Sequence, residues 1–179
     1  MKSLQEIENE LLVLKCRTGD RAAFEALVER WQQRLWRHAR LVIGEEDAAW
    51  DAVQETWVAI VNGISKLEAA GAFPAWAYKI LTGKCADIIR RRQRQRRMTD
   101  DLTTEAEHAE ENPPTEEGHD ALQAAVSRLP EDERVLLSLH YADGYTTNEI
   151  ADILGVAQGT VKARLFDARE HVRRLMGHS

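Results

Sequence analysis

The side chains with the clearest chemical potential in this 179-residue sequence are basic, and they suit phosphate binding rather than catalysis. Apolar residues recur at helical spacing after Gln158, which predicts a helix with one outward basic side. Four residues lie on that outward side: Lys162, Arg164, Arg169 and Arg173. A second basic group, 90–97, holds six arginines in eight residues and cannot belong to a core. Both groups favour nucleic-acid phosphates as ligands, with a solvated helix end as the alternative for the second.

Motifs of common catalysts are missing from the sequence. It contains no glycine-rich phosphate loop, paired-cysteine zinc site or serine nucleophile elbow. Asp47, Asp51 and Glu55 share one helix face, as metal-binding carboxylates do, but no matching histidine or second carboxylate helix accompanies them. We therefore expect a protein that is not an enzyme, with no cofactor and no metal.

The stretch that must position the outward basic residues runs from Thr146 to Arg174. Thr147 is expected to cap a short helix, and Gly155 to end it in the left-handed conformation of a tight turn. Ala151, Gly155 and Val161 are spaced four and six residues apart, which suits two closely crossing helices. This pattern predicts a helix-turn-helix that reads DNA, with an ordinary helical hairpin as the alternative.

The formal charge of −6 is unusual for a protein that binds nucleic acid, but the acidity is local. Residues 98–127 contain nine acidic residues and no lysine or arginine. The remainder of the chain carries 24 basic against 21 acidic residues. Its clustered arginines therefore suit a phosphate-binding surface better than the total charge suggests.

The compartment is expected to be the cytoplasm. Cys16 and Cys85 have no paired spacing, so we expect free thiols in a reducing environment. The first twelve residues, MKSLQEIENELL, lack the continuous apolar core of a signal peptide. No other segment approaches the length of a membrane span.

Apolar periodicity predicts an all-α first domain over residues 1–97. The expected helices cover 3–17, 21–42, 46–64 and about 74–97, with a loop at Ser65–Ala72. The first helix carries its large apolar residues on one face: Leu4, Ile7, Leu11 and Leu14.

Residues 98–118 show no apolar periodicity, and Asn112-Pro113-Pro114 excludes a regular helix through them. We interpret them as a flexible acidic linker. A second small helical domain, 119–179, contains the helix-turn-helix. The expected fold class is all-α, with two helical domains and no strands.

Three stretches of the sequence match a family pattern in order along the chain. DAVQETW at 51–57 is similar to D-x-x-Q-E-x-F, and FPAWAYKI at 73–80 is similar to F-x-x-W-L-Y-x-I. Leu129-Pro130 with Arg134, followed by EIADILGVAQGTVKAR at 149–164, completes the set. Together they resemble the bacterial RNA polymerase sigma factors of the sigma-70 family, in the extracytoplasmic-function (ECF) group.

The resemblance implies two jobs for the first domain. Asp51, Gln54 and Glu55 would bind the clamp helices of the largest subunit of core RNA polymerase. The loop Ser65–Ala72 would hold a base flipped from the opened −10 element. The residues implied for the single strand are Ser65, Lys66, Trp76, Tyr78, Lys79, Lys84, Arg90, Arg91, Arg92 and Arg94. Trp76 and Tyr78 would stack on bases, with core packing favoured for Trp76, and the basic residues would contact phosphates.

For the second domain, the resemblance implies that the helix from Gln158 enters the major groove of the −35 element. Its expected base contacts come from Gln158, Thr160, Lys162 and Arg164, and phosphate contacts from Thr147 and Arg169. The sequence departs from the family pattern at four places: Ala48-Ala49-Trp50 replaces an acidic run, Trp57 replaces a usual phenylalanine, Gly83 replaces a usual asparagine, and Ala163 replaces a frequent serine.

The function implied by the resemblance is transcription initiation with core RNA polymerase at a specific set of promoters. Expected partners are the polymerase, promoter DNA and an anti-sigma factor. A conventional helix-turn-helix regulator that binds a duplex operator without polymerase is the alternative, and it leaves the 51–57 motif unexplained. A helical interaction protein without a nucleic-acid role fits poorly with two basic surfaces.

Overall fold

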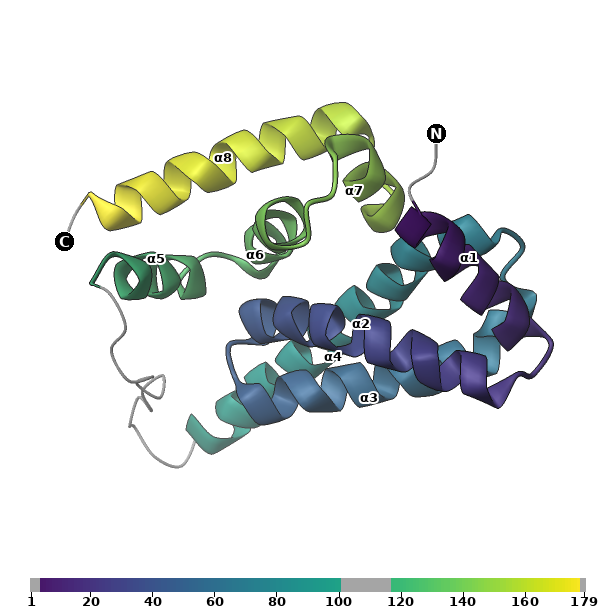
Figure 1. Ribbon diagram of the computed structural model, residues 1–179. Coiled ribbons are helices and arrows are strands. Elements are labelled where there is room, and N and C mark those ends of the chain that lie inside the picture. The colour runs from purple at the N-terminus through teal and green to yellow at the C-terminus, as the bar shows by residue number, and fades with distance from the viewer. Residues whose placement is uncertain (1–3, 101–116, 178–179) are drawn as a thin grey trace.

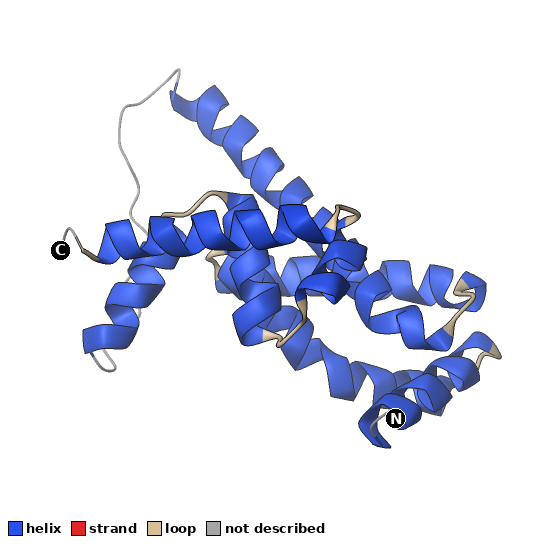
Figure 2. Cartoon of the chain, turned by 90° about the horizontal axis from the view of Figure 1, so that it is seen from above, coloured by secondary structure: helices blue, strands red, loops and turns tan. Residues whose placement is uncertain are grey.

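The computed structural model describes residues 4–100 and 117–177, and every regular element among these is helical (Figures 1 and 2). The first domain comprises α1 (Leu4–Arg17), α2 (Arg21–Ile43), α3 (Glu46–Gly63), two 3-10 turns η1 (Ile64–Lys66) and η2 (Ala70–Ala72), and α4 (Phe73–Asp100). The second comprises α5 (Glu117–Ser127), α6 (Glu131–Leu137), a π-helical turn η3 (Ser138–Ala142), α7 (Thr147–Leu154) and α8 (Gln158–Met176). The all-α prediction is confirmed.

The boundaries differ from prediction at two places. The expected loop Ser65–Ala72 contains most of η1 and all of η2, and α4 continues to Asp100. Most of the segment predicted as an acidic linker, 101–116, lies outside the described residues.

Local chemistry explains where α2 begins and ends. The Asp20 side chain accepts a hydrogen bond from the backbone N–H of Ala23, which satisfies an otherwise unpaired donor of the first turn. Gly44 ends the helix at φ +92°, a left-handed conformation that a residue with a β-carbon rarely adopts.

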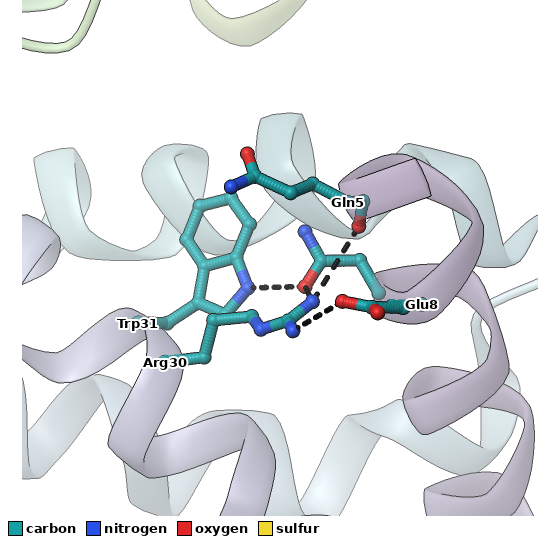
Figure 3. Close-up of polar contacts among 5 residues, drawn as sticks. Gln5, Glu8, Arg30 and Trp31 are labelled. Carbon is teal, nitrogen blue, oxygen red and sulfur yellow. Dashed lines mark hydrogen bonds and ion pairs between the residues drawn. The ribbon is translucent and has the colours of Figure 1, made fainter. Parts of the chain in front are cut away.

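The apolar face of α1 is exposed to solvent. Periodicity identifies such a face but does not predict whether it packs against the rest of the protein. Leu4, Ile7, Leu11 and Leu14 face outward, and the helix buries Val13 and Cys16 instead. Polar contacts fix this orientation (Figure 3). Arg30 donates to Glu8 at 2.7 Å, and the indole N–H of Trp31 donates to Asn9 at 3.2 Å.

The first-domain core is built where α2, α3 and α4 meet. Trp31 lies at its centre and makes edge-to-face contacts with Phe73 and Tyr78 at ring-centroid distances of 5.5 and 6.4 Å. Leu35 of α2 and Ile60 of α3 are also fully buried. This core holds α4 beside α3, and these two adjacent helices carry most of the first domain's candidate site residues.

A capping box begins the helix-turn-helix, and it corrects the predicted cap. Thr146, not Thr147, is the N-cap residue of α7. Its hydroxyl accepts from the Glu149 N–H at 3.3 Å, while the Glu149 carboxylate accepts from the Thr146 N–H at 2.8 Å. Gly155 ends α7 at φ +67°, as predicted, and α8 follows after Ala157.

The two domains pack against each other (Figure 1). Helix α2 contacts α6 and η3, and α4 contacts α7. Buried apolar residues from both domains form one continuous cluster. The contact brings the turn after η3 onto the side of α4 that carries Tyr78.

Candidate nucleic-acid interface

An exposed stripe runs along α3 and contains two of the three residues predicted to bind polymerase. Asp51 and Gln54 are exposed. Val58 and Val61 continue the stripe at helical spacing, with 62% and 54% of their surface exposed. Neither valine was predicted to have a function, although the helical spacing of Val58 and Val61 from Asp51 and Gln54 was a usable signal. Large apolar side chains beside polar ones suit a protein partner.

Glu55, the third predicted residue, lies to one side of this stripe and is half-buried. Its carboxylate forms ion pairs with Lys84 at 3.0 Å and with Arg91 at 3.9 Å. Both partners belong to α4 and were predicted to contact DNA phosphate. The structure therefore brings one predicted polymerase contact together with two predicted phosphate contacts.

The basic face of α4 is largely accessible. Lys79, Arg90, Arg91 and Arg94 are exposed. Arg90 pairs with Asp87 of its own helix at 3.3 Å, and Arg92 pairs with Glu45 at 2.6 Å. These exposed pairs are weak and easily exchanged for phosphate.

The loop side of the first domain divides into accessible and packed residues. Ser65 and Lys66 are exposed residues of η1. Trp76 is half-buried and lies against Gly63, where a β-carbon would come within 2.9 Å of its ring. This agrees with the packing role favoured for Trp76.

Tyr78 is fully buried, so the base stacking predicted for it would require the two domains to separate. Its hydroxyl donates to Asp143 of the second domain at 2.7 Å. Burial, followed by the charge of Asp143, raises the pKa of Tyr78 well above its usual range, so the phenol stays protonated. Sequence reasoning missed this contact because its partners lie 65 residues apart.

The first turns of α8 present the predicted reading residues to solvent. Gln158, Lys162 and Arg164 are exposed and Thr160 is half-buried, while Val161 and Leu165 fix the helix to the domain core. The Gln158 amide donates to the Thr147 hydroxyl at 3.1 Å, which joins the starts of α7 and α8. The Arg169 guanidinium lies 5.6 Å from the centre of the exposed Tyr141 ring.

Among the residues that the structure describes, no group of three His, Cys, Asp or Glu side chains is placed to hold a metal ion. Within the same part of the chain, no helix combines the length and apolar character needed to cross a bilayer.

Comparison with known proteins gives two family matches in chain order. The model for sigma-70 region 2 matches residues 27–95, and the model for sigma-70 region 4 matches residues 119–172. The ECF RNA polymerase sigma factor SigM of Mycobacterium tuberculosis is 32% identical over 161 residues, covering 89% of this chain and 80% of SigM. The ECF RNA polymerase sigma-E factor of Escherichia coli is 28% identical over 180 residues, covering 94% of each chain.

Solved structures agree in fold. CnrH, solved in complex with the cytosolic domain of CnrY, superposes with a TM-score of 0.74 at 23% identity, covering 96% of this chain and 99% of CnrH. The sigma factor RpoE of Bartonella quintana, solved with the anti-sigma factor NepR, gives a TM-score of 0.71 at 24% identity, covering 86% of this chain and 96% of RpoE.

Proposed function

Because the chain belongs to the ECF group of the sigma-70 family of RNA polymerase sigma factors, we propose that it uses α3 for core polymerase and α4 and α8 for promoter DNA. As a sigma factor, it binds core RNA polymerase and directs transcription initiation. The observation that carries the assignment of surfaces is the exposure of two separate residue sets, one around Asp51 and one around Arg164, on different domains.

The polymerase surface is the exposed stripe of α3. Asp51 and Gln54 supply charge and hydrogen bonds, and Val58 and Val61 supply apolar area at the next two turns. Glu55 contributes from the edge of the stripe, where Lys84 and Arg91 hold its carboxylate. A surface that combines an exposed apolar patch with charges fits a specific protein partner.

The first domain contacts the opened −10 element through α4 and the preceding loop. Lys79, Arg90, Arg91 and Arg94 are the accessible phosphate contacts, and Lys84 and Arg92 join them when their ion pairs exchange. Ser65 and Lys66 lie where the loop would hold a flipped base.

The second domain reads the −35 duplex through the start of α8. Amide and guanidinium groups of Gln158 and Arg164 match the base edges of adenine and guanine, and Thr160 and Lys162 complete the reading set. Thr147 and Arg169 flank this set and suit phosphates.

The proposed role needs no catalytic group of the chain, because polymerase makes and breaks the bonds. It places the protein in the cytoplasm, where transcription occurs. An anti-sigma factor is a further expected partner, supported by the fold shared with the RpoE that was solved with NepR.

Reconstituted transcription tests the proposal. Core polymerase plus the purified protein is expected to start transcripts at a limited set of genomic positions, mapped by sequencing transcript 5′ ends. Core enzyme alone is the control. Absence of stimulated transcription from any genomic fragment, together with absence of core binding, would contradict the proposal.

A further inference from the structure

A buried carboxylate lies between the two domains. The Asp143 side chain is only 5% exposed, and each of its oxygens faces a residue of the first domain. Oδ1 accepts from the Tyr78 hydroxyl at 2.7 Å, and Oδ2 lies 3.3 Å from Nδ1 of His38. The Ser138 hydroxyl, from η3, is 3.4 Å from the same Oδ2. The carboxylate is therefore held mainly by the other domain.

Aromatic rings surround this contact. Tyr145 of the second domain meets the Tyr78 ring edge-to-face at 5.1 Å, and His38 of α2 meets it at 5.2 Å. With Trp31 at 6.4 Å, the ring has protein neighbours from both domains. The second domain therefore covers part of Tyr78, a residue predicted to contact the opened strand.

The buried contact between Asp143 and the first domain specifies how the domains pack more than it stabilises the packed state. A buried charge is tolerated only with its hydrogen-bond partners, so Asp143 permits one placement of the second domain. Nε2 of His38 is buried without a hydrogen-bond partner, which lowers the stability of the packed state. A specific contact of limited stability can be released when a partner binds the separated domains better.

We propose that Tyr78, His38 and Asp143 form an autoinhibitory latch, which in the free chain holds the second domain over Tyr78, the residue of α4 predicted to stack on an unpaired base. The latch opens when the domains take up their separate sites on promoter and polymerase. The inhibitory effect rests on the proposed role of α4 in single-strand binding, whereas the latch itself does not.

Cys85 serves as the reporter of domain packing. It is fully buried on α4, and burial, followed by the charge of Glu131 on α6, raises its thiol pKa to about 12. Glu131 belongs to the second domain, so α6 lies near the thiol while the domains are packed. Cys16, buried in the first domain on α1, serves as the internal reference.

The experiment measures alkylation of both cysteines in the full-length protein by peptide mass spectrometry at pH 8. Asp143→Asn removes the charge of the acceptor, and Tyr78→Phe removes the hydroxyl donor. About 1.4 kcal/mol corresponds to a tenfold shift in opening. We expect at least about tenfold faster labelling of Cys85 in each variant, with Cys16 unchanged. Asp167→Asn, which removes an exposed carboxylate from α8, is the matched control and should label at the wild-type rate.

Two labelling outcomes would overturn the latch. One is a wild-type Cys85 rate in both variants. The other is equal acceleration of Cys85 and Cys16 in both variants, which would mean that the residues support overall folding rather than domain packing. Circular dichroism of each variant checks that its helix content is retained.

A second measurement separates the latch from its inhibitory effect. Fluorescence anisotropy with a mixed-sequence single-stranded oligonucleotide should show at least about fivefold tighter binding to Asp143→Asn than to Asp167→Asn. Faster Cys85 labelling without this gain would overturn autoinhibition. If the added substitution Arg90→Ala fails to weaken binding by the opened Asp143→Asn protein, the proposed function of α4 is contradicted instead.

Discussion

Lys84 and Glu55 join the two candidate interfaces of the first domain, with Nζ of Lys84 3.0 Å from Oε2 of Glu55. Glu55 belongs to the helix proposed to bind polymerase, and Lys84 to the helix proposed to bind DNA. When one of these residues engages its outside partner, the other loses a counter-ion. If both proposed roles hold, we expect binding of polymerase and binding of DNA to be electrostatically linked at this pair.

Replacing Lys84 by methionine should affect DNA binding more than folding. The pair is about a third exposed, and ion pairs at such sites contribute about 0–1 kcal/mol, so the unfolding free energy should change by less than about 1 kcal/mol. Loss of one phosphate contact should lower the slope of log affinity against log salt by about 1 for holoenzyme on promoter DNA. Lys15→Met, at an exposed site on α1, is the control. An unchanged slope would remove Lys84 from the DNA surface.

Asp51→Ala should weaken core binding while leaving the fold intact, because Asp51 is exposed and exposed substitutions usually change stability by less than about 0.5 kcal/mol. Loss of about 1–2 kcal/mol at a charged interface corresponds to an affinity about five- to thirtyfold lower. Titration of labelled protein with core polymerase measures the change. Glu29→Ala removes an exposed carboxylate from α2 and should retain full affinity.

Val58→Ser tests the apolar part of the same stripe. Because Val58 is 62% exposed, the substitution should change folding stability little, yet it should weaken core binding in the same titration. Wild-type affinity in Val58→Ser would restrict the polymerase surface to its polar residues.

Arg164→Ala and Arg169→Ala should separate base reading from phosphate binding. Loss of a bidentate base contact costs about 1–3 kcal/mol and relaxes sequence preference at one position of the −35 element. Loss of a phosphate contact weakens binding about equally on all sequences. Transcription by each holoenzyme from a library randomised at the −35 element distinguishes the two results. If both variants keep the wild-type preference, Arg164 does not read bases.

Helical periodicity predicted the helices because it depends on local spacing, but it did not predict how they dock. The apolar face of α1 was visible in the sequence, yet the helix docks through Val13, Cys16 and the polar Asn9. The polar contacts made in that orientation, such as that of Asn9 with Trp31, connect residues of different helices, so the period of α1 does not show them.

The candidate sites divide in the same way. Three of the four predicted reading residues of α8, Gln158, Lys162 and Arg164, are exposed and Thr160 is half-buried, because the buried positions of that helix follow from its own period. The burial of Tyr78 was not predicted, because Asp143, which accepts its hydrogen bond, belongs to another domain. Its stacking on a base stays a prediction. The valines at 58 and 61 were assigned no role, since apolar residues on a helix are usually expected in the core.

Gly63 and Gly83 both lie in helical surroundings, but only Gly63 is closely packed against another side chain. A β-carbon at Gly63 would come within 2.9 Å of Cζ2 of Trp76, whereas one at Gly83 would meet no atom within 4 Å. Neither glycine has a positive φ, so alanine fits the backbone at both positions. Gly63→Ala should therefore destabilise the protein by about 1–3 kcal/mol through overpacking. Gly83→Ala should stabilise it by about 0.5–1 kcal/mol through reduced chain entropy and better helix propensity. Urea unfolding of both variants measures the difference, and a stabilised Gly63→Ala protein would show that Trp76 is free to move away from α3.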